Sequence, residues 1–128
     1  MNDLKGINDT YGHEKGDMAI TTLCAQVCRI FKYSPVYRIG GDEFVVILEN
    51  TDYENRDILV EAFKEETKEI SQDNSLSPWE RVSAAIGCAI FDPARDKQVS
   101  SVFKRADEAM YVNKREIKGA SQDKSKTD

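Results

Sequence analysis

Two adjacent glycines, Gly40 and Gly41, lie between runs of apolar, β-favouring residues within residues 37–48. This pattern predicts a β-hairpin, because glycine readily adopts the positive φ angles that tight hairpin turns need. Two carboxylates, Asp42 and Glu43, follow the glycines at once. Such acids can bind Mg²⁺, which prefers oxygen ligands and often shares them with phosphates. The alternative is an ordinary polar hairpin tip that binds nothing.

The composition fits a single domain. The chain has 128 residues, 40% of them hydrophobic, which is enough for one core. It has no long apolar run, and its first residues lack the basic and apolar regions of a signal peptide. We therefore expect a cytoplasmic protein that makes no membrane contact. The net charge of −5 argues against nucleic acid as a partner, although a local basic cluster can still bind a nucleotide phosphate.

The spacing of apolar residues predicts the remaining elements. Helical spacing predicts core-facing helices over residues 16–32 and 56–71, and a last helix over residues 100–118. A β-rich run containing one glycine predicts a buried strand over residues 82–91. This order of helices and strands indicates an α+β fold, with a sheet covered by helices on one face.

Three blocks of the sequence contain recognisable motifs and follow one another along the chain. Residues 7–17 contain Asn-Asp followed by Gly-His-x-x-Gly-Asp, residues 40–44 read Gly-Gly-Asp-Glu-Phe, and residues 106–114 read Ala-Asp-Glu-Ala-Met-Tyr-Val-Asn-Lys. Together they resemble the GGDEF family, the bacterial diguanylate cyclases. The resemblance covers residues 1–118, which we take as the domain. Residues 119–128 read as a polar tail that we expect to be disordered.

The resemblance implies a ferredoxin-like palm of the nucleotide cyclase type, with a central antiparallel sheet and covering helices. Residues 1–5 match the pattern that follows the family's first core strand. The first helix, most of that strand and its metal-binding aspartate would therefore precede Met1. We expect an N-terminally truncated domain, whose longer natural chain carries a sensor or receiver domain.

The resemblance also implies the reaction. In the family, two GTP-loaded domains meet face to face as a homodimer. Each GTP 3′-hydroxyl attacks the α-phosphate of the other GTP, which yields cyclic di-GMP and pyrophosphate. The implied cofactor is Mg²⁺ or Mn²⁺, since nucleotidyl transfer depends on positioning, charge neutralisation and metal activation of the attacking hydroxyl.

The implied roles at the hairpin are as follows. Asp42 is a metal ligand, joined by the backbone carbonyl of Met1. Glu43 either assists catalysis or coordinates a second metal, and the sequence does not separate these roles. Gly40 and Gly41 allow the nucleotide to approach the backbone closely.

The guanine-binding positions implied by the resemblance are Asn8 and Asp17. Asn offers an acceptor and two donors, and Asp offers acceptors only, which together can read a guanine edge. Each residue also suits a purely structural role. Asn8 and Asp9 fit an Asx-type turn, and Asp17 fits the positive end of a helix dipole.

Phosphate binding is assigned by the resemblance to Lys114 and Lys118. These residues are one helical turn apart, so both can reach one triphosphate as compact point charges. The alternative is that cations in a final helical turn only stabilise the helix dipole.

The predicted function is a diguanylate cyclase domain, with GTP as substrate. Without the missing aspartate, we expect catalysis by the chain as given to fall by orders of magnitude, since metals contribute several kcal/mol of transition-state stabilisation. The alternative is a noncatalytic GTP-binding regulatory module. A pure interaction domain is disfavoured, because it gives no reason for the Gly-Gly-Asp-Glu arrangement.

Overall fold

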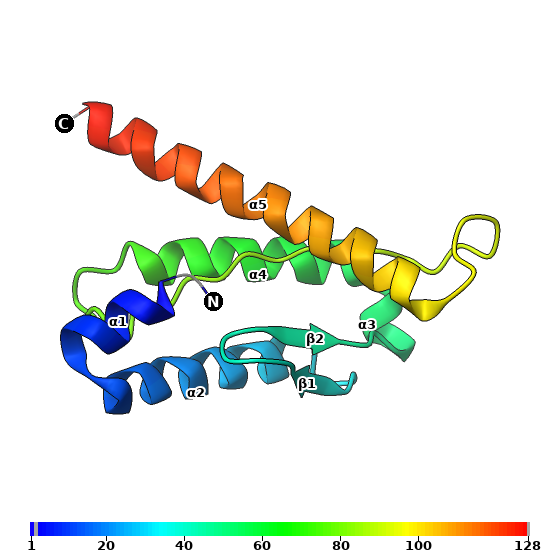
Figure 1. Ribbon diagram of the computed structural model, residues 1–128, viewed down its shortest axis with the longest axis horizontal. Helices are drawn as coiled ribbons and strands as arrows, with labels where there is room; N and C mark the ends of the chain where they lie inside the picture. The colour runs from blue at the N-terminus through cyan, green and yellow to red at the C-terminus, as the bar shows by residue number, and fades with distance from the viewer. Residues whose placement is uncertain (2, 128) are drawn as a thin grey trace. The chain divides into compact units, whose positions relative to one another are not determined.

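The computed structural model describes residue 1 and residues 3–127, with the side chains of residues 1 and 3–119. The elements, coloured in chain order in Figure 1, are α1 (Leu4–Tyr11), α2 (His13–Ile30), β1 (Val36–Arg38), β2 (Phe44–Val46), α3 (Asn50–Glu54), α4 (Arg56–Ser71) and α5 (Val99–Thr127). Helices and an antiparallel two-stranded sheet confirm the predicted α+β class. The chain divides into two compact units, residues 1–84 and residues 85–128.

The first unit begins with α1 and α2, which are joined at Gly12 and pack against each other (Figure 1). Gly12 has a φ of 92°, which favours glycine, and its N–H donates to the Asn8 carbonyl oxygen at 2.9 Å. The sequence pattern does not predict α1, because Gly6, Asn8 and Asp9 are residue types that favour turns over helix interiors. The buried apolar side chains of the two helices are Ile7, Ala19, Ile20, Leu23 and Val27.

The predicted β-hairpin follows α2. Its strands are antiparallel, with Val36 opposite Val46, and each has three residues. The Ile39 N–H donates to the Glu43 carbonyl oxygen at 2.9 Å and closes the loop, in which Gly40 has a φ of 81°. Glycine therefore occupies the one loop position with a positive φ, as expected from its freedom to adopt that conformation.

The start of the hairpin is tied to α3 by a buried carboxylate. Asp52 accepts hydrogen bonds from the Tyr33 N–H at 2.9 Å and from the Ser34 hydroxyl at 2.7 Å. The Ser34 oxygen accepts a third bond from the Glu49 N–H at 3.1 Å. These bonds satisfy backbone donors on both sides of the hairpin, so Asp52 ties the start of the hairpin to α3.

Replacing Asp52 with alanine is expected to lower the free energy of unfolding by about 1–3 kcal/mol, because the Tyr33 N–H loses its partner in a part-buried position. Urea unfolding measures this loss. Glu54→Ala, at an exposed acid of the same helix, is the matched control. Equal stability of the two variants would contradict the assigned role of Asp52.

The second long helix of this unit, α4, coincides with the helix predicted over residues 56–71. Its buried residues are Phe63 and Thr67. The Thr67 hydroxyl donates to the Val82 carbonyl oxygen at 3.4 Å and accepts from the Ala84 N–H at 3.2 Å. Residues 82–84, which follow the loop after α4, are therefore hydrogen-bonded to a side chain of that helix.

The buried strand predicted over residues 82–91 is wrong, because this segment joins no β-ladder among the described residues. Its N–H groups bind side chains instead. Ala84 donates to Thr67 in the first unit, and Ile86 donates to the Asn113 Oδ1 at 2.9 Å in the second. Val82 and Ala84 are buried, as expected for a core segment, but a strand also requires a hydrogen-bonded partner.

The second unit consists of residues 85–98 and α5. The buried Asp96 carboxylate forms an ion pair with Arg105 and accepts from the Asp92 N–H at 2.8 Å. The hydrogen bonds from Arg105 and Asp92, together with the positive charge of Arg105, hold the pKa of Asp96 below its usual value. Arg105 also donates to the Ile90 carbonyl oxygen at 2.7 Å, so it ties this segment to α5.

The last helix is longer than predicted, since the backbone of α5 continues through Thr127 rather than ending at residue 118. The predicted tail, residues 119–128, falls almost wholly outside the residues whose side chains are described. Its disorder stays a prediction. None of the described helices has both the length and the apolar character that crossing a membrane requires.

Candidate functional site

The hairpin turn brings Gly40, Gly41, Asp42 and Glu43 together. The Arg38 guanidinium spans the loop, with Nε and Nη2 donating to the Gly41 carbonyl oxygen at 3.1 and 2.5 Å. No described atom lies within 4 Å of the position that a Cβ would take at either glycine. The two carboxylates are half-buried. The loop is therefore braced from one strand while its glycine side stays open to a ligand.

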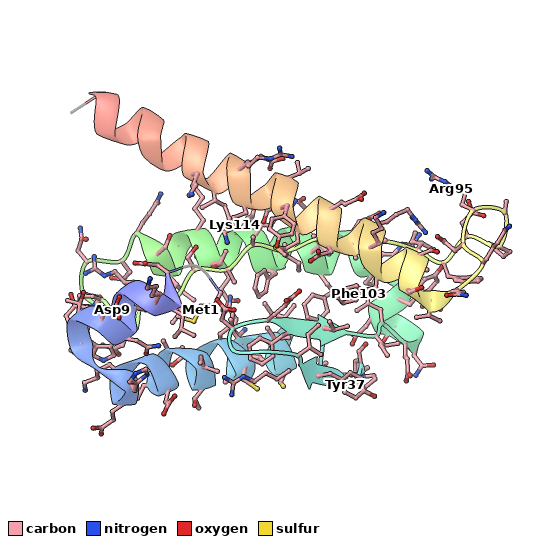
Figure 2. All side chains as sticks on the ribbon, viewed as in Figure 1. Met1, Asp9, Tyr37, Arg95, Phe103 and Lys114 are labelled. Atoms are coloured by element: carbon pink, nitrogen blue, oxygen red, sulfur yellow. The ribbon has the colours of Figure 1, made fainter. Side chains whose placement is uncertain are left out.

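The first residue of the chain lies at this turn. The Met1 nitrogen donates to the carbonyl oxygen of Asp42 at 2.8 Å, across 41 positions in the sequence. Figure 2 shows Met1 next to the hairpin loop. The contact brings the backbone of residue 1 beside the candidate metal ligand, as the metal-site prediction requires. That the Met1 carbonyl binds a metal stays a prediction.

The residues at the turn are compatible with Mg²⁺, although they do not form a complete protein cage. Among the described residues, no three His, Cys, Asp or Glu side chains gather into a metal-binding cluster. Asp42 and Glu43 offer two carboxylates in succession. Mg²⁺ is commonly bound by one or two carboxylates, with substrate phosphates and water completing the octahedron. This donor set therefore fits a metal that arrives with a nucleotide.

The two candidate guanine-binding residues are on neighbouring helices. Asn8 is half-buried in α1, and its Oδ1 occupies the space that a Cβ would take at Gly16. The Asn8 amide therefore rests on the backbone of α2, directly before the exposed Asp17. This approach is possible only because residue 16 has no side chain.

The fold bears on both purely structural roles for this pair. An Asx-type turn at Asn8 and Asp9 is wrong, because both residues lie inside α1. Asp17 lies in the second turn of α2, which begins at His13, and the helix dipole acts mainly on the first turn.

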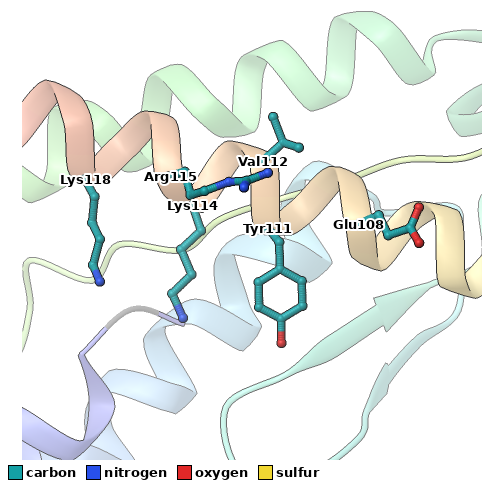
Figure 3. Close-up of a pocket in the computed structure, with 6 residues that line it drawn as sticks. All are labelled: Glu108, Tyr111, Val112, Lys114, Arg115 and Lys118. Carbon is teal, nitrogen blue, oxygen red and sulfur yellow. The ribbon is translucent and has the colours of Figure 1, made fainter.

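The candidate phosphate-binding residues are in the second unit. Lys114, Lys118 and Tyr111 project to the same side of α5 (Figure 3). The two lysines contribute to an open pocket of about 460 Å³. Its lining residues are Glu108, Tyr111, Val112, Lys114, Arg115 and Lys118. That the two ammonium groups bind one polyphosphate stays a prediction.

Comparison with known protein families gives a match to "Diguanylate cyclase, GGDEF domain" over residues 1–120. The chain belongs to the GGDEF family. The GGDEF domain is 32% identical over 115 residues to "Probable diguanylate cyclase DgcJ" of Escherichia coli (strain K12), a match that covers 89% of this chain and 22% of DgcJ. It is also 32% identical over 114 residues to "Diguanylate cyclase DgcM" of the same strain, covering 84% of this chain and 25% of DgcM.

A third relative of this GGDEF domain is named for two activities. "Bifunctional diguanylate cyclase/cyclic di-GMP phosphodiesterase MucR" of Pseudomonas aeruginosa is 32% identical over 113 residues, covering 87% of this chain and 16% of MucR. No solved structure matches the chain significantly. The GGDEF domain thus spans about a quarter or less of these relatives, which contain further sequence outside the match.

Two residues at the GGDEF domain's basic pocket are not predicted from the sequence. Tyr111 lies three residues before Lys114 and shares its side of the helix, so helical spacing could have identified it. Arg115 also lines the pocket, but it directly follows Lys114 and points elsewhere (Figure 3). Consecutive helical residues face different directions, so only the structure reveals its place in the lining.

Proposed function

We propose that this GGDEF domain is a diguanylate cyclase, which condenses two GTP molecules into cyclic di-GMP and two pyrophosphates. The observation that most supports this proposal is the geometry of the hairpin turn. Arg38 holds the turn by hydrogen bonds, the space beside its two glycines is open, and Asp42 and Glu43 follow those glycines. The names of the relatives support the same reaction. The proposed fold is the ferredoxin-like palm of the nucleotide cyclases, of which the hairpin forms one part.

The reaction forms two phosphodiester bonds. The 3′-oxygen of each GTP bonds to the α-phosphorus of the other, the bond to the β-phosphate oxygen breaks, and pyrophosphate leaves. Each 3′-hydroxyl must lose its proton. We assign to Glu43 either acceptance of this proton or a share in holding a metal, and Asp42 would hold the metal with the Met1 carbonyl. A bound Mg²⁺ supplies charge neutralisation at the phosphates and lowers the pKa of an attacking hydroxyl.

Substrate recognition is assigned to the two helical sites. Asn8 accepts and donates hydrogen bonds at the guanine edge and Asp17 accepts them, which would select GTP over ATP. Lys114 and Lys118 bind phosphate oxygens as positive point charges. Because the product joins two nucleotides, we propose that two domains act as a face-to-face homodimer in the cytoplasm. A sensor or receiver domain of a longer protein would bring them together.

The second candidate is a noncatalytic GTP-binding regulatory module. One observation favours it: the described residues hold two carboxylates at the turn and no third acidic ligand. A site that binds GTP and Mg²⁺ without activating the hydroxyl would change partner contacts on binding and form no product.

The deciding experiment is incubation of the chain with GTP and Mg²⁺, with chromatographic separation of cyclic di-GMP and pyrophosphate, alongside calorimetric measurement of GTP affinity. Product formation supports the cyclase. GTP binding without product supports the regulatory module. The absence of both, in folded protein at high concentration, would overturn the proposal. A chimera with an aspartate-ended strand ahead of Met1 tests whether a missing metal ligand limits turnover.

Replacing Asp17 with asparagine is expected to lower the affinity for GTP roughly tenfold and to leave the affinity for ATP nearly unchanged. The physical reason is the loss of a charged acceptor for the guanine donors, a type of hydrogen bond worth about 1.5–3 kcal/mol and less where exposed. Calorimetry with both nucleotides measures the effect. Asp57→Asn, at an exposed acid of α4, serves as control. An equal loss for GTP and ATP would refute guanine recognition by Asp17.

A further inference from the structure

An aromatic and cationic contact joins the loop before residue 82 to the α1–α2 junction. Trp79, the only tryptophan of the chain, is half-buried. Its ring centroid lies 5.3 Å from that of Tyr11, with an interplanar angle of 63°. The Lys15 ammonium lies 4.5 Å from the Trp79 centroid. The edge-to-face pair and the cation over the ring are both attractive geometries.

The two partners of Trp79 stand on opposite sides of the Gly12 turn. Tyr11 ends α1, three residues after Asn8. Lys15 lies in the first turn of α2, two residues before Asp17. One side chain therefore contacts both helices close to the two candidate guanine-binding residues. Since Gly12 has no side chain to limit its rotation, the angle between the helices depends on such contacts.

The loop that presents Trp79 is itself held by hydrogen bonds. The Glu80 N–H donates to the Ser77 carbonyl oxygen at 2.8 Å, and the Glu80 carboxylate accepts from the Ser77 N–H at 2.9 Å. The bonds that Ser77 donates to the carboxylate, and to a lesser degree the Lys15 charge, hold the pKa of Glu80 below its usual value. The hydrogen bonds between Ser77 and Glu80 therefore order the loop next to Trp79, whose ring the Lys15 ammonium contacts.

We propose that Trp79 is a positioning residue for guanine recognition: it clamps α1 to α2 and so sets the placement of Asn8 relative to Asp17. This inference rests on the proposed function, because it assumes that these two residues bind guanine. The role of Trp79 is indirect, through Tyr11 and Lys15. The Asn8 amide rests on the Gly16 backbone, so a small rotation of α1 would move this amide relative to α2, which carries Asp17.

The test compares the affinities of the full chain for GTP and for ATP, whose base lacks the N1–H and 2-amino donors of guanine. Trp79→Ala should reduce the preference for GTP roughly tenfold, as expected for loss of the ring and cation contacts. The affinity for ATP should change much less. Trp79→Phe keeps an aromatic ring beside Tyr11 and Lys15 and should restore most of the preference.

The matched control is Tyr53→Ala, which removes an exposed ring whose centroid lies 4.6 Å from the Arg56 guanidinium carbon, away from Asn8. It should leave the preference unchanged. Thermal unfolding of each variant identifies any loss of folded protein. Because Trp79 is the only tryptophan, its fluorescence in the wild-type chain should also change when GTP binds and not when inorganic pyrophosphate binds.

The outcomes separate the two hypotheses. A wild-type chain without preference for GTP overturns the guanine assignment and the clamp with it. A wild-type preference that Trp79→Ala leaves intact overturns the clamp alone. An equal loss of affinity for both nucleotides also overturns it, because that result indicates a structural role without influence on guanine recognition.

Discussion

Replacing Asp42 with asparagine should remove the Mg²⁺ dependence of GTP binding and lower any turnover of GTP by roughly 100-fold or more. The substitution preserves the shape of the side chain and removes the charge that a hard divalent cation needs. It should not disturb the turn, because Met1 binds the backbone carbonyl of Asp42 and Arg38 binds that of Gly41. The effect is therefore chemical rather than structural.

Calorimetric titration with GTP, in the presence and absence of Mg²⁺, measures this effect even if the chain forms no product. Glu49→Gln, at an acid that follows β2, is the matched control and should behave as the wild type. Product analysis gives the second readout. If the Asp42→Asn variant kept the wild-type Mg²⁺ dependence, the hairpin carboxylate would not be the metal ligand.

Adding one methyl group at Gly87 should be the most damaging small change to the second unit. A Cβ there would collide with the Ala106 carbonyl oxygen and the Met110 nitrogen and would lie 2.8 Å from the Ala109 carbonyl carbon. All three atoms belong to the backbone of α5, so none can rotate away. The segment and the helix must separate, and overpacking of this kind typically costs about 1–3 kcal/mol, occasionally more.

Urea unfolding of Gly87→Ala measures the loss of stability, and hydrogen exchange locates it. The Ile86 N–H, which donates to Asn113, should exchange faster once α5 moves away. Gly119→Ala is the control on the same helix, since no described atom lies within 4 Å of its Cβ position. That change should be neutral or slightly stabilising, because alanine favours helices more than glycine. Wild-type stability and exchange in Gly87→Ala would contradict the close packing.

The sequence was sufficient for elements whose signal is local. The apolar stripe over residues 56–71 predicts α4 with its observed bounds, because helical hydrogen bonds join residues four apart and the stripe repeats with the same period. The glycine pair predicts the hairpin, because the loop needs one positive φ and Gly40 supplies it. The close packing at Gly87 also follows from the sequence, since a glycine within a buried run marks a close approach.

The sequence predicts which residues form the candidate site, but it does not predict how those residues are arranged in space. The sequence names Asn8 and Asp17, but it does not show that the Asn8 amide rests on Gly16. It names Lys114 and Lys118, whose shared direction follows from their spacing, and it misses Arg115 in the same pocket lining. Each motif names residues whose side chains suit a binding role. The packing of the helices decides where those side chains lie in space.

What the sequence determined by itself was the family, the hairpin with its carboxylates, and the helices with a strong period. Only the tertiary structure decided that residues 82–91 bind helix side chains instead of a strand, that Met1 reaches Asp42, and that Trp79 joins α1 to α2. The reason is physical. Local patterns follow from hydrogen bonds and φ angles within a few residues, whereas these contacts join residues far apart, whose meeting depends on how the whole chain packs.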